Sequence, residues 1–91
     1  MRKIVYSTQF RKDYRRYLNK PKFLAALNDI LRMLESGLPV PADRSPHKLH
    51  GTFKGCMECH IGGDYLLIWM DLTTDTVKLV RLGTHHELFG K

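Results

Sequence analysis

The amino-acid sequence predicts a two-layer α+β fold, with a helical hairpin packed on one face of a mainly antiparallel four-stranded sheet. Helix-like periodicity is confined to the first half of the chain, whereas strand-like stretches separated by turn sequences fill the second half. Helices that precede an antiparallel meander favour two layers, with both helices on one sheet face. The expected order is β-α-α-β-β-β. A length of 91 residues without an internal repeat indicates a single domain, residues 1–91.

The first half of the chain is expected to form a short strand and two helices. Residues 2–6 read as the strand, and Ser7 or Thr8 offers an N-cap for the first helix. The apolar face of this helix carries side chains at helical spacing, namely Phe10, Tyr14, Tyr17 and Leu18. Pro21 fits the first turn of the second helix, and Gly37 fits its C-terminal cap. The apolar stripe of the second helix comprises Leu24, Leu27, Leu31 and Leu34.

The second half of the chain is expected to form a long loop and three strands. Residues 38–52 hold three of the four prolines and read as the loop, which is long enough to suggest a functional role. The strand-like stretches are 53–61, 65–71 and 76–82, with turn residues between them. Gly83 and Thr84 are expected to open a short C-terminal turn that ends near Phe89. The sheet face away from the helices is where we expect the chemistry.

The charge balance favours an anionic partner. Lysine and arginine number 15 against 9 aspartate and glutamate residues, so the net charge is +6 and the isoelectric point is about 9.6. No stretch approaches the roughly 20 apolar residues of a membrane span, so no membrane association is expected. Two cysteines without an export signal indicate reduced thiols in the cytoplasm.

Four titratable residues stand near the ends of the predicted strands. His47 precedes the second strand, His60 ends it, Asp64 opens the third, and His85 follows the fourth. An imidazole with a pKa near 6.5 can both accept and donate a proton around neutral pH. Histidines gathered on a basic surface therefore suggest acid–base chemistry on a polyanion.

Several of these positions also have a purely structural interpretation. Asp64 suits a turn, Arg81 could form an ordinary surface ion pair, and Phe89 could pin the C-terminus to the core. His50 and His86 are expected to be solvated surface residues.

The segment Cys56–His60 matches the C-x-x-C-H signature of haem c attachment. We interpret this match as coincidental, because haem c requires export and because cysteines three residues apart in a strand point to opposite faces. Cys59 and Met57 are expected to face the core. No metal and no cofactor is predicted.

Three ordered motifs resemble those of the RelE/ParE superfamily of bacterial type II toxins, specifically its YafQ-like branch. They are HKLHGTFKG at 47–55, Cys59-His60 followed by Asp64-Tyr65, and RLGTHHELF at 81–89. The resemblance covers essentially the whole chain. It implies a RelE-like fold and a ribosome-dependent mRNA endonuclease that a cognate acidic antitoxin holds inactive. The expected partners are therefore the antitoxin, the ribosome and mRNA.

The resemblance also implies that His47, His60, Asp64 and His85 are catalytic. We predict metal-free cleavage in which the ribose 2′-hydroxyl attacks the adjacent phosphorus. His47 is assigned as the general base and His85 as the general acid, although these two labels could be exchanged. His60 and Asp64 would orient the substrate or the partner imidazoles.

Further residues are assigned to binding. Arg81 would hold the phosphate with its planar guanidinium, and Phe89 would stack on a base. Tyr65 is a second candidate for stacking, and stands where the branch often has tryptophan. The basic face of the first helix would contact ribosomal RNA or the antitoxin through Arg11, Lys12, Arg15 and Arg16.

Two alternatives remain open at the level of sequence. A superfamily member can instead inhibit DNA gyrase, a role that does not need the histidine cluster. The chain could also be a basic RNA- or protein-binding domain whose catalytic residues have decayed.

Overall fold

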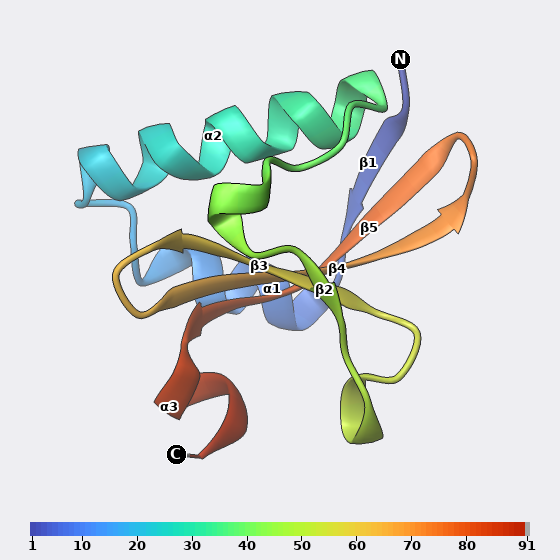
Figure 1. Cartoon of the computed structure of the whole chain (residues 1–91). Coiled ribbons are helices and arrows are strands. Elements are labelled where there is room, and N and C mark those ends of the chain that lie inside the picture. Colours follow the sequence, from blue (N-terminus) through green and yellow to red (C-terminus); the bar gives the residue numbers. More distant parts are fainter. Residues whose placement is uncertain (91) are drawn as a thin grey trace.

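The sheet has five strands in the order β1-β5-β4-β3-β2, and all its neighbours are antiparallel except β1 and β5 (Figure 1). The structure is a computed structural model and describes residues 1–90. The longer strands are β1 (Lys3–Tyr6), β3 (Met57–Gly62), β4 (Tyr65–Thr73) and β5 (Thr76–Thr84). The helices are α1 (Thr8–Arg15), α2 (Pro21–Ser36) and α3 (His85–Phe89), with 3-10 turns η1 (Ala42–Arg44) and η2 (Gly51–Phe53). The predicted α+β class is confirmed.

The predicted strand count was one too low. Strand β2 (His47–Lys48) lies within the proline-rich loop, and its two residues are too few to produce a periodic pattern. The strand predicted from residue 53 begins only at Met57, because a 3-10 turn and Gly55, with φ of 92°, interrupt it. The last strand runs to Thr84, which then caps α3.

The caps that the sequence indicates for the two long helices are present. The Ser7 side chain accepts a hydrogen bond from the Phe10 N–H at the start of α1. Pro21 is the first residue of α2, and Gly37 ends it with φ of 75°. The placement of Leu18 on the apolar face was wrong: α1 ends at Arg15, and Leu18 is 60% exposed.

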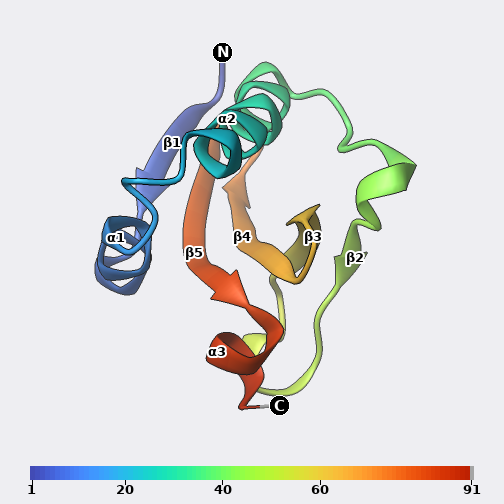
Figure 2. The same cartoon turned by 90° about the vertical axis from the view of Figure 1, so that its left-hand side faces the viewer.

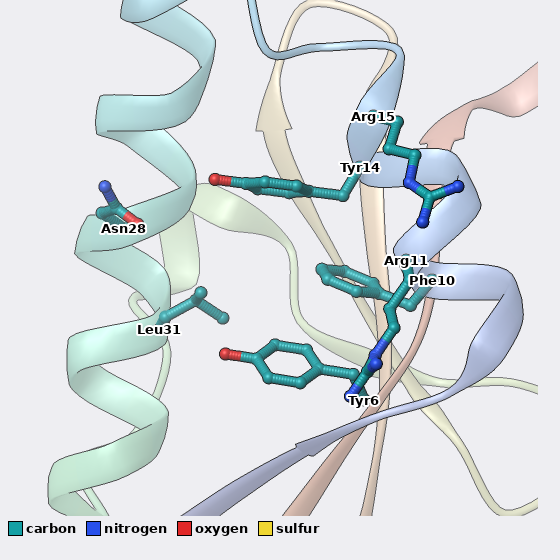
Figure 3. Close-up of a pocket in the computed structure, with 7 residues that line it drawn as sticks. All are labelled: Tyr6, Phe10, Arg11, Tyr14, Arg15, Asn28 and Leu31. Atoms are coloured by element: carbon teal, nitrogen blue, oxygen red, sulfur yellow. The ribbon is translucent and has the colours of Figure 1, made fainter.

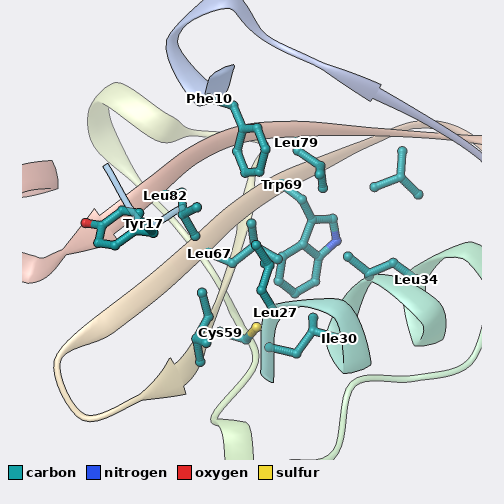
Figure 4. Close-up of a cluster of buried hydrophobic side chains, with 12 residues drawn as sticks. Phe10, Tyr17, Leu27, Ile30, Leu34, Cys59, Leu67, Trp69, Leu79 and Leu82 are labelled. Carbon is teal, nitrogen blue, oxygen red and sulfur yellow. The ribbon is translucent and has the colours of Figure 1, made fainter. Parts of the chain in front are cut away.

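The sheet separates two hydrophobic clusters. The larger one lies under α1 and α2, and includes Leu27, Ile30, Leu67 and Trp69 (Figure 4). The smaller one lies on the other face, where Leu66, Ile68 and Leu88 pack with Cys56. Figure 2 shows α2 at the top and α3 at the bottom, with the strands between them. Each sheet face is therefore partly buried, and α3 covers the smaller cluster.

The two cysteines belong to different clusters, as the strand periodicity predicts. Cys59 and the neighbouring Met57 face the larger cluster, whereas Cys56 lies in the smaller one. Burial raises the pKa of the Cys59 thiol to about 12 and raises that of Cys56 as well. Thiols that stay protonated on opposite faces of a sheet are poor candidates for shared metal ligation.

Helix α1 covers the edge of β5 beyond the end of β1. The Ser7 hydroxyl donates to the Val80 carbonyl at 2.7 Å, and the Leu82 N–H donates to Asp13 Oδ2 at 3.0 Å. Asp13 is fully buried and also accepts a hydrogen bond from Arg81 Nε at 2.8 Å. These contacts satisfy strand-edge groups that would otherwise remain unpaired. Within residues 1–90, no helix combines the length and apolar character needed to cross a membrane.

Replacing Asp13 with alanine should destabilise the fold strongly, because it leaves the Leu82 N–H and the Arg81 guanidinium without their acceptor. We expect Asp13→Ala to lower the free energy of unfolding by about 3 kcal/mol. Asp29→Ala is the matched control: it removes an exposed ion pair with Arg32 and should change this free energy by less than about 1 kcal/mol. Urea denaturation measures both. Equal losses would show that the α1–β5 contact is not a major source of stability.

Candidate active site

The sheet face opposite α1 and α2 carries two rows of residues that run across the strands. The first row pairs His47 of β2 with Glu58 of β3, Glu58 with Ile68 of β4, and Ile68 with Arg81 of β5. Because side chains two residues apart in a strand share a face, His60 lies on the same face as Glu58. The first row therefore presents an imidazole and a carboxylate side by side.

The second row contains His60 of β3, Leu66 of β4 and Gly83 of β5. Gly83 lies under α3, where an added Cβ would come within 3.0 Å of Glu87 Oε1 and 3.4 Å of a Leu88 carbon. The absence of a side chain at Gly83 thus lets α3 fold close over the sheet. His60 itself is exposed.

Helix α3 places His85 at the end of the sheet that also carries Asp64. The His85 N–H donates to the Asp64 carbonyl oxygen at 3.3 Å, next to the Tyr65–Thr84 pair of β4 and β5. The order of the strands thus settles what spacing left open: His85 does reach the β3–β4 turn, which His60 precedes. His47 lies diagonally from His60 on the neighbouring strand.

Glu87 fixes α3 to the helical layer. Its carboxylate accepts hydrogen bonds from the Thr84 N–H at 2.8 Å and the Tyr17 hydroxyl at 2.7 Å, and pairs with Arg16 at 2.9 Å. The hydrogen bond from the Thr84 backbone, followed by that from Tyr17, lowers the pKa of Glu87. Burial and the contact with Glu87 raise the pKa of Tyr17. These contacts set the position of His85.

Glu58 is the site residue that sequence reasoning missed. It is 3% exposed, and its Oε1 lies 3.1 Å from His47 Nε2. The other ring nitrogen, Nδ1, lies 2.7 Å from the Ser45 carbonyl oxygen. A signal was present in the sequence: Glu58 and His60 alternate with apolar residues in a strand, so they had to share one face.

Phe89 lies beside the histidines, but Tyr65 does not. The Phe89 ring centroid is 5.2 Å from that of His85 and 5.7 Å from that of Phe53. Tyr65 faces the helical layer instead, with its ring 5.6 Å from Tyr17 and 5.0 Å from Phe23. Of the two aromatic candidates, only Phe89 shares the histidine face.

Arg81 is held sideways by α1. Its Nε and Nη2 bond to the two carboxylate oxygens of Asp13 at 2.8 and 3.3 Å. Because Asp13 is fully buried, the pair is not an ordinary surface ion pair. The guanidinium is fixed by this contact, while its remaining N–H groups stay available.

A separate groove lies between α1 and α2 (Figure 3). It has a volume of about 420 Å³, and Tyr6, Phe10 and Tyr14 form a ladder of rings along it, with successive centroids 5.7 and 6.1 Å apart. Two cations of α1, Arg11 and Arg15, also line this groove. Lys12 is exposed, whereas Arg16 is engaged with Glu87.

Within the part of the chain that the structure describes, no group of three or more histidine, cysteine, aspartate or glutamate side chains is placed to hold a metal ion.

The fold and the site both match a known family of bacterial toxins. The family model for the bacterial toxin of type II toxin–antitoxin systems, YafQ, matches residues 2–90. The mRNA interferase toxin YafQ of Escherichia coli strain K12 is 36% identical over 95 residues, covering 98% of this chain and 97% of that protein. The chain therefore belongs to the YafQ family of type II toxins, which confirms the resemblance to that branch.

Solved structures agree with this assignment. A crystal structure of the Escherichia coli DinJ–YafQ complex has a TM-score of 0.84 at 35% identity, covering 99% of this chain and 100% of that one. A copper-bound mutant toxin from Helicobacter pylori has a TM-score of 0.87 at 32% identity, covering 98% of this chain and 100% of that one.

The lowered pKa of Glu87 makes its contribution to stability depend on pH. A carboxyl whose pKa is depressed by folding stabilises the folded state above its unfolded value, about 4.3, and loses this contribution as the pH falls through the folded value. Glu87→Gln should therefore unfold at lower temperature than the wild type at pH 7, with a difference that shrinks between about pH 5 and about pH 3. Thermal unfolding across this range measures the effect. A difference independent of pH would argue against the carboxylate as the source.

Proposed function

We infer that this chain, like its Escherichia coli relative, is an mRNA interferase, and we propose that it cleaves message presented by the ribosome without a metal ion. The observation that carries the proposal is the gathering of His47, His60 and His85 with Asp64 on one side of a basic sheet domain. No comparable cluster of titratable groups would be needed to inhibit DNA gyrase, so the nuclease is the favoured function.

The proposed reaction needs a base, an acid and a cation. One of His47 and His85 removes the proton of the ribose 2′-hydroxyl, whose oxygen attacks the adjacent phosphorus, and the other protonates the departing 5′-oxygen. Each well-placed proton transfer typically contributes about 10²–10⁴-fold. His60 and Asp64 orient these groups. The ribosome contributes by holding the codon in line for attack.

Substrate contacts are assigned to the neighbouring side chains. Arg81, which Asp13 holds rigidly, offers its remaining N–H groups to the phosphoryl oxygens. Phe89 stacks on a base beside His85. Tyr65 is left out of this role, because its ring packs on the helical side of the sheet.

We assign the α1–α2 groove to the cognate antitoxin. A relative forms a complex with the antitoxin DinJ, and the groove combines an aromatic ladder with Arg11 and Arg15, which suits an acidic segment carrying apolar anchors. The same cations, with Lys12 and Arg16, contact ribosomal RNA phosphates in the active toxin. Action on translating ribosomes places the protein in the cytoplasm.

Removing either catalytic imidazole should abolish toxicity. We expect His47→Ala and His85→Ala each to reduce cleavage of ribosome-bound message by at least about 10²-fold. His50→Ala and His86→Ala are the matched controls and should retain full activity. Mapping message ends from expressing cells measures the cuts, with growth arrest as a second readout.

Three results would contradict this function. Full toxicity of both catalytic variants at matched expression would remove the assignment of the two histidines. DNA damage without message cuts would indicate a gyrase inhibitor. Expression without cuts, damage or arrest would indicate a decayed domain.

The groove assignment predicts a variant that escapes inhibition. Tyr6→Ala removes an anchor ring of the groove, so antitoxin binding should weaken by about tenfold or more, while cleavage by the free toxin stays unchanged. Leu72→Ala is the control, since Leu72 and Tyr6 are each 48% exposed. Titration calorimetry measures the affinity. Unchanged affinity of Tyr6→Ala would place the antitoxin elsewhere.

A further inference from the structure

Glu58 is an expensive residue for this fold to carry. Its carboxylate is buried on the smaller-cluster face of the sheet, in register with Ile68, and its Oε2 has no hydrogen-bond partner. An unpaired buried polar atom destabilises the folded state and calls for an explanation. Within residues 1–90, Glu58 and His47 form the only ion pair between a histidine and a carboxylate. The explanation is therefore to be sought in what Glu58 does to His47.

The contacts of His47 fix where its protons lie. The Ser45 carbonyl oxygen, 2.7 Å from Nδ1, can only accept, so Nδ1 must carry a hydrogen. An ionised Glu58 carboxylate also only accepts, so Nε2, 3.1 Å from Oε1, must carry a hydrogen too. An imidazole between two acceptors is an imidazolium. The nearest other titratable group on this face, His60 of β3, offers no competing negative charge.

We propose that Glu58 is a positioning residue that keeps His47 doubly protonated, so that His47 is the general acid of the cleavage reaction and His85 the general base. This inference rests on the proposed function and assigns the two labels that the sequence left interchangeable. Glu58 holds Nε2 from the buried side, while the Nδ1 hydrogen points to the Ser45 carbonyl on an exposed segment. Nδ1 is therefore the nitrogen that turns to the substrate.

The proton transfers balance as follows. His85 accepts the 2′-hydroxyl proton, and the 2′-oxygen forms a bond to phosphorus. The bond from phosphorus to the 5′-oxygen breaks, and that oxygen takes the hydrogen of His47 Nδ1, whose electron pair stays on the nitrogen. The products are a 2′,3′-cyclic phosphate and a 5′-hydroxyl. His47 is left neutral with its hydrogen on Nε2, the form that Glu58 accepts, and solvent returns the proton from His85 to His47.

The protonation state can be observed directly in the intact toxin. Nitrogen-15 NMR of the wild-type protein at neutral pH should show hydrogen on both ring nitrogens of His47, with the exposed His50 as the internal reference. In Glu58→Gln, which keeps the shape of the side chain, His47 should lose the hydrogen from Nε2 while His50 is unchanged. A His47 ring with only one hydrogen in the wild type would overturn the proposal.

Cleavage of a modified message tests the acid role. Glu58→Gln should slow cleavage of ordinary ribosome-bound message by on the order of 10²-fold, with little change in KM. A message with sulfur in place of the scissile 5′-oxygen needs no acid, so Glu58→Gln and His47→Ala should both cleave it at close to the wild-type rate. His85→Ala should stay slow on both messages, because the base is still required.

Controls separate this role from a structural one. Glu35→Gln, in α2, should cleave both messages like the wild type. Thermal unfolding should show Glu58→Gln to be as stable as the wild type, because it removes a buried charge. A rate loss that sulfur does not restore would overturn the acid role. If the wild type cleaves no message, both the proposed function and the acid role fail, whereas the NMR result still decides whether Glu58 holds the second hydrogen.

Discussion

The alternation of side chains along β3 is the constraint on which the site depends. Met57, Cys59 and Ile61 must point into the core beneath the helices, so Glu58 and His60 between them are forced onto the other face. Shifting the strand by one residue would bury the two polar groups under α2 and expose the apolar ones. The free energy of burying the core thus also holds the chemical groups in place.

The two buried carboxylates of this protein serve different ends, and their hydrogen bonds separate them. Asp13 accepts from Arg81, from the Leu82 N–H and from Gln9, so both of its oxygens are satisfied. Such a group fixes structure, here the docking of α1 on the edge of β5. Glu58 has one oxygen bonded and one unpaired, which is the pattern of a group retained for its charge rather than for stability.

Local signals in the sequence predicted the local structure well. The Ser7 cap, Pro21 and Gly37 act within a few residues of themselves, and the helices begin and end where they indicate. Pairings between distant residues had no such signal: the contact of Arg81 with Asp13 spans 68 positions. Strand β2 escaped because two residues show no period. Without β2, the partner of Glu58 could not be identified.

The catalytic residues were found from motifs, but their arrangement required the strand order. The motif containing Tyr65 says nothing of which sheet face the ring occupies, and the register of β4 places it among Tyr17 and Phe23. His85 could be placed beside Asp64 only once β4 was known to lie between β3 and β5.

Helix α1 and the turn that follows it connect the groove to the catalytic face. Phe10 and Tyr14 line the groove, whereas Asp13 of the same helix holds Arg81, and Arg16 and Tyr17 hold α3 through Glu87. A partner seated in the groove therefore lies on the helix that fixes both the phosphate-binding cation and the position of His85. Because these contacts are short and buried or partly buried, a displacement of α1 cannot occur without disturbing them. Occupation of the groove and geometry of the site are thus mechanically linked, even though the two lie on different sides of the sheet.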